Sequence, residues 1–377
     1  MKVIFVGGGT SGHINPAINI ANCLKKLRPD SEILYVGAKG GLEEALVKKA
    51  GFQFRGITVS GFCRNISFSS IKKNIFSVIR ILTSQYESKK IIKHFAPDIC
   101  IGTGGYVSGP FLRQAGKMGI KFAIHEQNAF PGLTTKLLAK KSEVVMLGSK
   151  DAHKYFPRKT AMIFTGNPLG DVKIFPRDKA LKILREKNKN LFKNEKKIIL
   201  SFGGSLGAKA INNTILEIMG QRKYNHIHSY GKFNSNFLEK LEKSEVAHEK
   251  ERILIRDYIT NMDICMSVAD LVISRAGAMT ISELAAAGKP AILIPSPYVA
   301  ANHQYFNAVS LAKTSACRVI EEKNLNSEAL ESEIEKILEN ETLLKNHSDN
   351  MKKNFTPCAA EKICKIIFSL VDCGSKN

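Results

Sequence analysis

The chain has 377 residues, enough for two domains with separate hydrophobic cores. Its 44% hydrophobic and 24% charged residues are ordinary for a globular protein. No apolar stretch approaches the roughly 20 residues that a membrane-spanning helix requires. The first residues predict a strand and a glycine-rich turn rather than a signal peptide.

The formal net charge is +22. Three explanations compete: a nucleic-acid partner, an anionic membrane surface, or a Lys-rich composition spread over solvated faces. The sequence has no nucleic-acid-binding motif with interleaved aromatic residues, so we expect no nucleic-acid partner. The 8 cysteines and 9 histidines lack metal-ligand spacing. We therefore expect no metal, and buried free thiols in a reducing cytosol.

In the first half, short β-branched runs alternate with helical patterns. The segments that carry these expected strands and helices are, in chain order, 3–7, 16–27, 32–37, 42–51, 98–105, 121–127, 143–149 and 161–168. This alternation predicts a mostly parallel sheet covered by helices on both faces.

The pattern restarts after a charged stretch, Arg177–Lys197. The corresponding segments of the second half are 196–219, 226–231, 252–258, 270–278 and 290–297. We therefore expect two doubly wound domains, residues 1–166 and 167–356. Residues 357–377 follow as a helix that packs on either domain, with packing back on the N-terminal one as one arrangement. Open parallel sheets bind ligands outside the carboxyl ends of their strands, so two facing sheets predict a cleft lined by loops from both.

A Gly-x-Gly-x-x-Gly pattern, formed by Gly7, Gly9 and Gly12, follows the first strand and opens a helix. A dinucleotide site would also need an acidic residue at the end of the second strand, which instead ends at Gly37. The sequence therefore disfavours NAD. The loop offers backbone N–H groups at a helix N-terminus, which suits an anion. Pro16 predicts that the first helical turn lies there.

His13 stands at the same corner with Thr10 and Ser11. This setting predicts a catalytic or substrate-contacting role rather than a core histidine. Imidazole is the side chain that titrates nearest to neutral pH. We expect His13 to act as the general base, with Glu126 and His125 as rivals.

The second half has its own ligand signals. Gly203–Gly207 forms a second glycine loop before a helix, which again suits an anion. In the stretch 274–290, a strand and a glycine turn lead into a helix expected to start near Ala278, whose N-terminus favours a diphosphate. Glu283 in that helix is suited to accept hydrogen bonds from two ribose hydroxyls. The alternative is a capping interaction of Glu283 with Thr280.

Together these segments resemble the MurG family of peptidoglycan synthesis. The motifs that carry the resemblance are GGGTSGHINPA (7–17), GTGGYVSGP (102–110), HEQN (125–128), TGNP (165–168), FGGSLGA (202–208), SRAGAMTISELAAAGKP (274–290) and HQYFNA (303–308). Each motif is short, but the set in this order is highly specific and spans nearly the whole chain.

The resemblance implies an α/β protein of the GT-B fold, with two doubly wound Rossmann-like domains facing across a cleft. It implies inverting transfer of GlcNAc from UDP-GlcNAc to the C4 hydroxyl of MurNAc in undecaprenyl-diphosphoryl-MurNAc-pentapeptide, which converts lipid I to lipid II. The implied partners are UDP-GlcNAc, the undecaprenyl-linked lipid I and an anionic membrane surface, with no cofactor required. The first domain would bind acceptor and membrane, and the second UDP-GlcNAc. The implied location is peripheral, at the cytoplasmic face of the inner membrane.

The resemblance also implies residue roles. The expected donor contacts are Thr10, Ser11, Gly12, Asn128, Ser205, Ile259, Ala278, Met279, Thr280, Ile281, Ser282, Glu283 and Gln304. Gly104 and Gly105 are expected to hold the acceptor's diphosphate through backbone N–H groups, and Tyr106 to pack on its sugar. Gly170 stands where the family usually has Arg, which leaves a side-chain phosphate contact in doubt.

Two further points stay open. The segment 66–82 combines apolar residues with Lys and Arg as a membrane-surface helix does, and an ordinary half-buried helix fits the pattern equally well. The lipid tail of the implied acceptor favours the membrane-surface helix. Other GT-B enzymes, such as a diacylglycerol glycosyltransferase or a hydrolysing or epimerising UDP-GlcNAc enzyme, share the fold. A product assay with lipid I separates these alternatives.

Overall fold

The computed structural model describes residues 1–59, 83–186, 188–232 and 235–372. The segment 66–82, with its predicted surface helix, therefore lies outside the described residues. The chain forms two compact units: unit 1 is Met1–Gly170 with Thr356–Asn377, and unit 2 is Asp171–Phe355. The first boundary thus falls at Gly170, where the sequence suggested residue 166.

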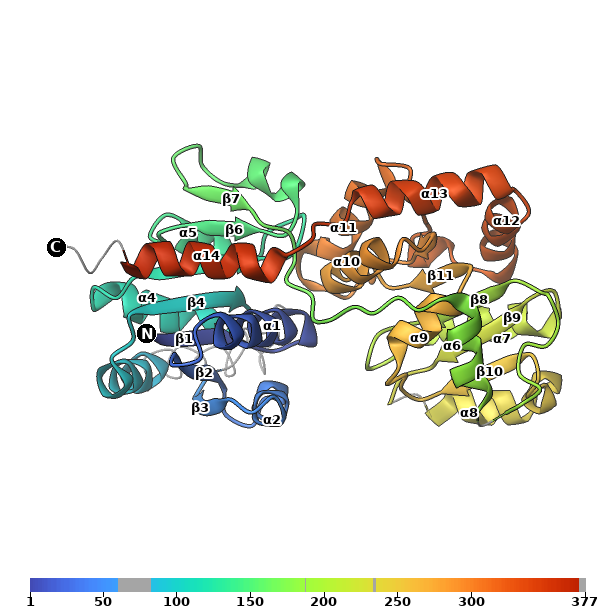
Figure 1. Ribbon diagram of the computed structural model, residues 1–377, viewed down its shortest axis with the longest axis horizontal. Helices are drawn as coiled ribbons and strands as arrows, with labels where there is room; N and C mark the ends of the chain where they lie inside the picture. The colour runs from blue at the N-terminus through green and yellow to red at the C-terminus, as the bar shows by residue number, and fades with distance from the viewer. Residues whose placement is uncertain (60–82, 187, 233–234, 373–377) are drawn as a thin grey trace, which may run out of the picture. The chain divides into compact units, whose positions relative to one another are not determined.

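Unit 1 is built on a parallel sheet of seven strands in the order β3-β2-β1-β4-β5-β6-β7 (Figure 1). The strands are β1 (Lys2–Gly7), β2 (Glu32–Ala38), β3 (Gln53–Ile57), β4 (Ile99–Gly104), β5 (Phe122–Glu126), β6 (Val145–Leu147) and β7 (Met162–Phe164). Alternate residues of β1 enter different cores, since Val3 and Phe5 join one cluster and Ile4 and Val6 another. Burial on both faces explains why this strand is a continuous apolar run.

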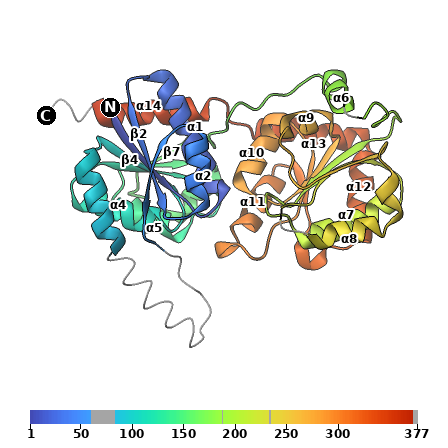
Figure 2. The same cartoon turned by 90° about the horizontal axis from the view of Figure 1, so that it is seen from below.

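Helices cover both faces of this sheet. They are α1 (Ser11–Leu27), α2 (Leu42–Lys49), α4 (Ser108–Lys117), α5 (Leu133–Ala139) and α14 (Ala359–Asp372), with a 3-10 helix η1 (Lys150–Tyr155). In Figure 2, α1 and α14 lie on one face and α4 and α5 on the other. The apolar stripe of α14, including Ile363 and Ile367, packs in one core with Ile20 and Leu24 of α1. The C-terminal helix therefore belongs to unit 1.

The predicted position of Pro16 in the first helical turn is wrong. Thr10 has extended backbone angles, φ −145° and ψ 154°, and α1 begins directly after it at Ser11. Pro16 consequently lies inside the helix and cannot donate to the carbonyl of Gly12, four residues earlier. Gly12 is exposed, so water can satisfy that carbonyl.

Unit 2 repeats the architecture with a parallel sheet of six strands in the order β10-β9-β8-β11-β12-β13. The strands are β8 (Ile198–Phe202), β9 (Asn225–Ser229), β10 (Ile253–Arg256), β11 (Leu271–Ser274), β12 (Ala291–Leu293) and β13 (Cys317–Val319). The α-helices are α6 (Arg177–Arg185), α7 (Lys209–Gly220), α8 (Ser235–Glu242), α9 (Met262–Val268), α10 (Ala278–Ala287), α11 (His303–Ala312), α12 (Ser327–Leu338) and α13 (Glu341–Lys353). Short 3-10 helices are η2 (Glu245–His248), η3 (Ala300–Asn302) and η4 (Glu322–Asn324).

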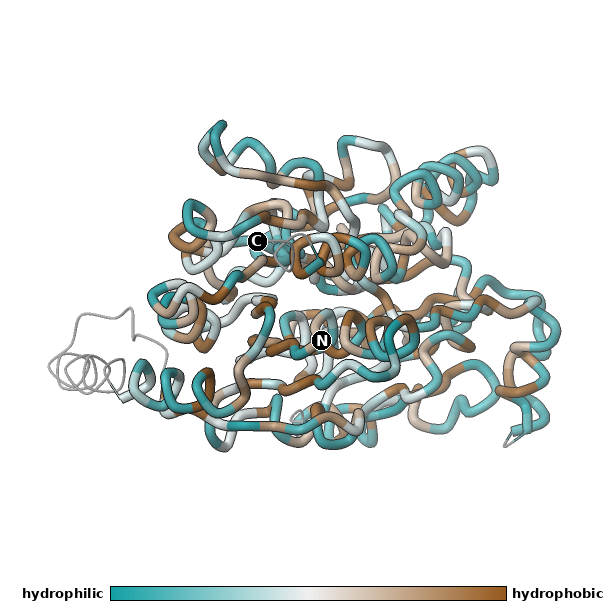
Figure 3. Tube along the Cα trace, turned by 60° about the vertical axis from the view of Figure 1, so that its left-hand side comes forward, coloured by the Kyte–Doolittle hydropathy of each residue, from teal (hydrophilic) through white to brown (hydrophobic). Residues whose placement is uncertain are grey.

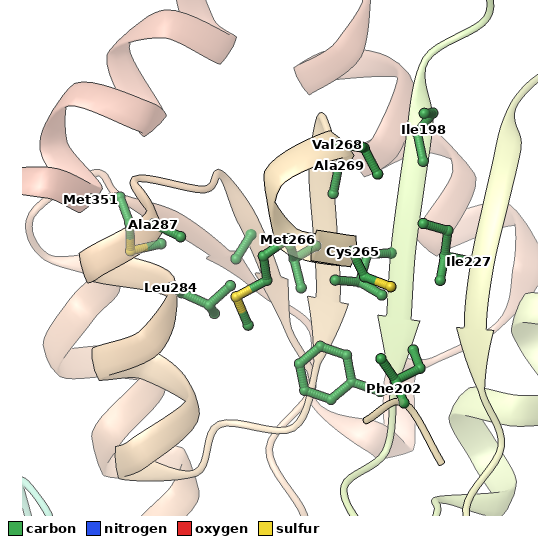
Figure 4. Close-up of a cluster of buried hydrophobic side chains, with 14 of the residues drawn as sticks. Ile198, Phe202, Ile227, Cys265, Met266, Val268, Ala269, Leu284, Ala287 and Met351 are labelled. Carbon is green, nitrogen blue, oxygen red and sulfur yellow. The ribbon is translucent and has the colours of Figure 1, made fainter. Parts of the chain in front are cut away.

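The core of unit 2 also has two sides. Figure 4 shows one of them, where Ile227 of the sheet lies near Cys265 of α9, and Leu284 of α10 lies near Met266 in the same cluster. Hydrophobic residues, brown in Figure 3, follow the strands within the units. None of the helices in the described part of the chain has the length and apolarity to traverse a bilayer.

Each sheet has one point where the strand order reverses, between β1 and β4 in unit 1 and between β8 and β11 in unit 2. The loops that leave adjacent strands in opposite directions open a crevice at such a point, and ligands of doubly wound folds bind there. All the glycine loops singled out in the sequence leave these four strands.

Candidate active site

In unit 1, the loops after β1 and β4 touch through their backbones. A Cβ atom on Gly105, whose φ is +82°, would lie 2.1 Å from the carbonyl oxygen of Gly8, so only glycine fits. The ring of Tyr106 lies against Gly9. Gly104, Gly105 and Tyr106 are thus brought beside the first glycine loop, where Thr10 and Gly12 are exposed and Ser11 is half-buried.

Glu43 lies beneath this loop, which sequence reasoning missed. Its buried carboxylate accepts hydrogen bonds from the N–H of Gly9, at 3.3 Å, and of Ala38, at 2.8 Å. The Gly9 N–H is therefore not free for an anion. The only available signal was an acidic residue two positions after Gly41, which alone indicates no more than a helix start.

His13, on the first turn of α1, is held by two oxygen acceptors. Its Nδ1 lies 3.0 Å from the carbonyl oxygen of Thr103 and 3.3 Å from Oε1 of Gln127. Both can only accept, so Nδ1 carries the proton and Nε2 carries the lone pair. The hydroxyl of Thr103 donates to the carbonyl of His13 at 2.7 Å and fixes the backbone as well. This geometry leaves Nε2 as a basic atom on a half-buried ring.

His125 and Glu126, the rival bases, are both occupied within unit 1. His125 is completely buried; its Nε2 donates to the carbonyl of Gly166 at 3.0 Å, and its Nδ1 accepts from Gln127 at 3.1 Å. Burial lowers the pKa of His125 to about 4. Glu126 accepts from the backbone and amide N–H groups of Asn128 and from Gly132, at 3.0–3.1 Å. These bonds hold the turn that follows β5, and they tie Asn128 to Glu126.

In unit 2, the second glycine loop forms a tight exposed tip. A Cβ on Gly203 would lie 2.4 Å from the Ala208 nitrogen, and Gly204 has a φ of +90°. Ser205 is exposed at the tip. Asn212, in the first turn of α7, is buried, donates to the carbonyl of Tyr230 at 2.9 Å and leaves its Oδ1 without a partner in the described residues. Sequence reasoning missed Asn212. Neither it nor the adjacent Asn213 belongs to a recognised motif, so nothing distinguished the two asparagines.

Glu283 lies in the second turn of α10, which begins at Ala278 after the extended residue Gly277. Its carboxyl makes no hydrogen bond or ion pair within the part of the chain that the structure describes, so the alternative cap on Thr280 is not formed. Burial raises the pKa of Glu283 to about 7. Carboxyl groups withdrawn from water usually have hydrogen-bond donors, and this half-buried carboxyl receives none from the described residues. The N-terminus of α10, which no side chain caps, lies in the same segment, with residues 278–282 half-buried.

The remaining predicted residues flank α10. Gln304, near the start of α11, accepts from the backbone N–H of Ser296 at 2.9 Å through Oε1. Ile259 follows β10 with its side chain in the core. Arg275, which sequence reasoning missed, pairs with Glu322 and donates to the carbonyl of Ile294 at 3.2 Å, which braces the turn before α10.

The predicted residues thus fall into two sets, one in each unit, on loops and helix starts that follow the strands; those after β1, β4, β8 and β11 lie at the reversal points of the sheets. Thr10–His13, Gly104–Tyr106 and Asn128 belong to unit 1, and Ser205, Ile259, Ala278–Glu283 and Gln304 to unit 2. No cluster of three His, Cys, Asp or Glu side chains able to hold a metal occurs among the described residues.

Comparison with known proteins defines the class. Residues 3–147 match the glycosyltransferase family 28 N-terminal domain, and residues 198–363 match the C-terminal domain of that family. These matches make the chain a family 28 glycosyltransferase, and the two parallel sheets confirm the predicted GT-B fold.

Named relatives narrow this class. The UDP-N-acetylglucosamine--N-acetylmuramyl-(pentapeptide) pyrophosphoryl-undecaprenol N-acetylglucosamine transferase of Thermoanaerobacter sp. (strain X514) is 43% identical over 375 residues, covering 98% of this chain and 100% of the relative. Its namesake in Acetivibrio thermocellus is 42% identical, covering 97% of both chains. The crystal structure of Acinetobacter baumannii MurG superposes with a TM-score of 0.76 at 26% identity, covering 98% of this chain and 99% of that one. The chain belongs to the MurG family, which confirms the resemblance.

Proposed function

We propose that this chain transfers GlcNAc from UDP-GlcNAc to the C4 hydroxyl of MurNAc in undecaprenyl-diphosphoryl-MurNAc-pentapeptide, with inversion at the anomeric carbon, and so converts lipid I to lipid II. The observation that carries the proposal is Glu283: a half-buried carboxyl without a protein partner in the described residues, one and a half turns into a helix whose N-terminus no side chain caps. Two ribose hydroxyls would supply the missing donors.

In this proposal unit 2 holds the donor. The N–H groups and dipole of α10 from Ala278 on, with the loop at Ser205, stabilise the diphosphate as UDP departs with the bonding electron pair. The backbone around Ile259 contacts uracil, and the amide of Gln304 binds GlcNAc hydroxyls. We include no cofactor, since these groups already offset the negative charge that develops on the leaving group.

His13 is the proposed general base, acting through Nε2. It removes the proton of the acceptor's C4 hydroxyl while that oxygen attacks the anomeric carbon, and Nδ1–H stays bonded to the carbonyl of Thr103. The backbone N–H groups of Gly104 and Gly105 bind the acceptor's diphosphate, and Tyr106 packs on its sugar. The engaged nitrogens of His125 and the engaged carboxylate of Glu126 favour His13 over these rivals.

We also propose that the chain binds the cytoplasmic face of the membrane peripherally, as a lipid-linked acceptor requires. Helix α5 supports this. Its Leu133 and Leu137, one turn apart, are 73% and 70% exposed. The exposed Lys140 and Lys141 follow at its C-terminal end. Exposed leucines beside lysines suit the boundary of an anionic bilayer.

Substitution of the proposed base tests the mechanism. His13→Ala should lower kcat at least about 100-fold, the lower bound for general base catalysis. It should leave the affinity for UDP in calorimetry unchanged, since α10 and Glu283 are untouched. His94→Ala, which alters an exposed histidine of the same unit, is the matched control and should behave as wild type. Wild-type turnover in His13→Ala would exclude His13 as the base.

A further inference from the structure

Gln127 joins the two histidines at the carboxyl edge of sheet β3-β2-β1-β4-β5-β6-β7. It directly follows β5 and is only 3% exposed. Its Nε2 lies 3.1 Å from both the carbonyl oxygen and Nδ1 of His125, and its Oε1 lies 3.3 Å from Nδ1 of His13. The amide therefore bridges the side chains of His13 and His125.

The carbonyl oxygens at both ends of this hydrogen-bonded series, which can only accept, determine the direction of each bond between His13, Gln127 and His125. The peptide carbonyl of His125 can only accept, so the NH₂ end of Gln127 must face it. The oxygen end of Gln127 then faces His13, whose Nδ1 must carry the proton. The carbonyl of Thr103, 3.0 Å from the same Nδ1, demands the same tautomer.

The protonation of His125, at the other end of the hydrogen-bonded series, is determined independently. The carbonyl of Gly166 accepts from Nε2 of His125 at 3.0 Å, so Nδ1 of His125 is unprotonated and accepts from Gln127. Asn167 donates to the carbonyl of Gln127 at 3.3 Å and holds its backbone. Each bridging nitrogen and oxygen of Gln127 and His125 has a partner, which favours a single arrangement of these two side chains. Burial lowers the pKa of His125 to about 4, which keeps it neutral at physiological pH.

We infer that Gln127, anchored through His125 to Gly166, is a positioning residue that holds His13 as the Nδ1–H tautomer and so reserves Nε2 for the acceptor's proton. This inference rests on the proposed role of His13. As Nε2 takes the proton, the bond from Nδ1–H to Gln127 becomes charge-assisted and strengthens. The amide thus favours the protonated state that the base reaches during transfer.

Ring-nitrogen NMR of histidine-labelled full-length protein tests the tautomers without any substrate. Signals are assigned by comparison with His13→Gln and His125→Gln variants. We expect neutral His13 to be protonated on Nδ1 and His125 on Nε2, opposite tautomers in one protein. In Gln127→Met, the fraction of His13 protonated on Nε2 should rise. A wild-type His13 with its proton on Nε2 would overturn the inference.

Kinetics at saturating donor provide the second test. Gln127→Met should lower kcat roughly 10- to 100-fold, the usual worth of a hydrogen bond to a charged group, with the donor KM changed less than about twofold. The acidic limb of its pH profile for kcat should move to lower pH. In Gln127→Glu a carboxylate replaces the amide oxygen, so the limb should move to higher pH. Glu43 and Tyr106, titratable groups at the adjacent loops, are the same in both variants.

The outcomes separate the inference from the proposed function. Gln114→Met, the same change at a buried glutamine of α4, controls for packing and should leave the limb and the tautomers unchanged. Gln127→Met could have a lower kcat while the acidic limb of its pH profile and the tautomers of His13 and His125 stay unchanged. That result would show that Gln127 only packs against its neighbours, and His13 would remain the base. Wild-type turnover in His13→Ala would instead remove the proposed base itself.

Discussion

At Glu283, burial favours the neutral carboxyl, whereas the proposed binding of ribose hydroxyls favours the ionised carboxylate. Burial raises the pKa of its carboxyl from 4.5 to about 7, because nothing in the described protein compensates the charge. The ionised form is the better acceptor for ribose hydroxyls. The free protein therefore carries an unfavourable charge that the donor would stabilise, which is a common compromise at binding sites.

Donor binding should consequently depend on pH near neutrality. As the pH falls from 8 to 6, Glu283 protonates and the donor KM of the wild type should rise. Glu283→Gln should show a higher donor KM at pH 8 with little further change at pH 6. Steady-state kinetics at fixed, saturating acceptor measure both. An equally steep pH dependence in the variant would assign the titration to another group.

The same substitution should stabilise the ligand-free protein at high pH. The folded pKa is raised, so the wild type loses stability as the pH rises from about 4.5 through about 7. Glu283→Gln removes that loss, and we expect a gain on the order of 1–2 kcal/mol at pH 8 that shrinks towards pH 5. Thermal unfolding without UDP at the two pH values measures it. A variant less stable than wild type at pH 8 would contradict the assigned burial.

At the scale of elements, the glycine turns at the reversal points of the sheets determine how the loops meet. Sequence patterns predicted these turns, because glycine spacing after an apolar strand is a local signal. The polar contacts beneath them were not predictable. Glu43 reaches Gly9 across 34 residues of chain and Gln127 reaches His13 across 114. Only the register of the strands creates such pairs.

Gly105→Ala should show the cost of crowding these loops. Its Cβ would meet the carbonyl oxygen of Gly8 at 2.1 Å, so the loops after β1 and β4 must separate. We expect a higher acceptor KM and a loss of roughly 1–3 kcal/mol in stability. Gly51→Ala, with a φ of +83° but open space around the new atom, controls for the backbone angle alone. Equal losses of stability in Gly105→Ala and Gly51→Ala would show that the close contact between Gly105 and Gly8 contributes nothing beyond the backbone angle.

At the scale of the whole molecule, the chain returns to unit 1 after completing unit 2. The sequence predicted the two doubly wound sheets from the recurrence of strand and helix patterns. It did not predict which unit the last helix packs on, because an amphipathic stripe shows that one face of a helix is buried but does not identify its packing partner. The core shared by Ile367 and α1 decides this, and it makes unit 1 dependent on residues at the far end of the sequence.

Ile367→Asp should therefore destabilise unit 1 alone. A charge placed at this fully buried position should cost about 3 kcal/mol or more. We expect one of two calorimetric unfolding transitions to move to lower temperature, while the transition that UDP stabilises stays in place. Lys365→Asp, at an exposed position of the same helix, is the control. Movement of the UDP-sensitive transition would show that α14 supports unit 2 instead.

The measurement that tests the account most directly is transfer of labelled GlcNAc from UDP-GlcNAc to a short-chain lipid I analogue, with diacylglycerol as a parallel acceptor and a reaction without acceptor. We expect labelled disaccharide only with lipid I, with turnover greatly reduced in His13→Ala. Label on diacylglycerol, or UDP-GlcNAc consumed at the same rate without an acceptor, would contradict the proposed reaction.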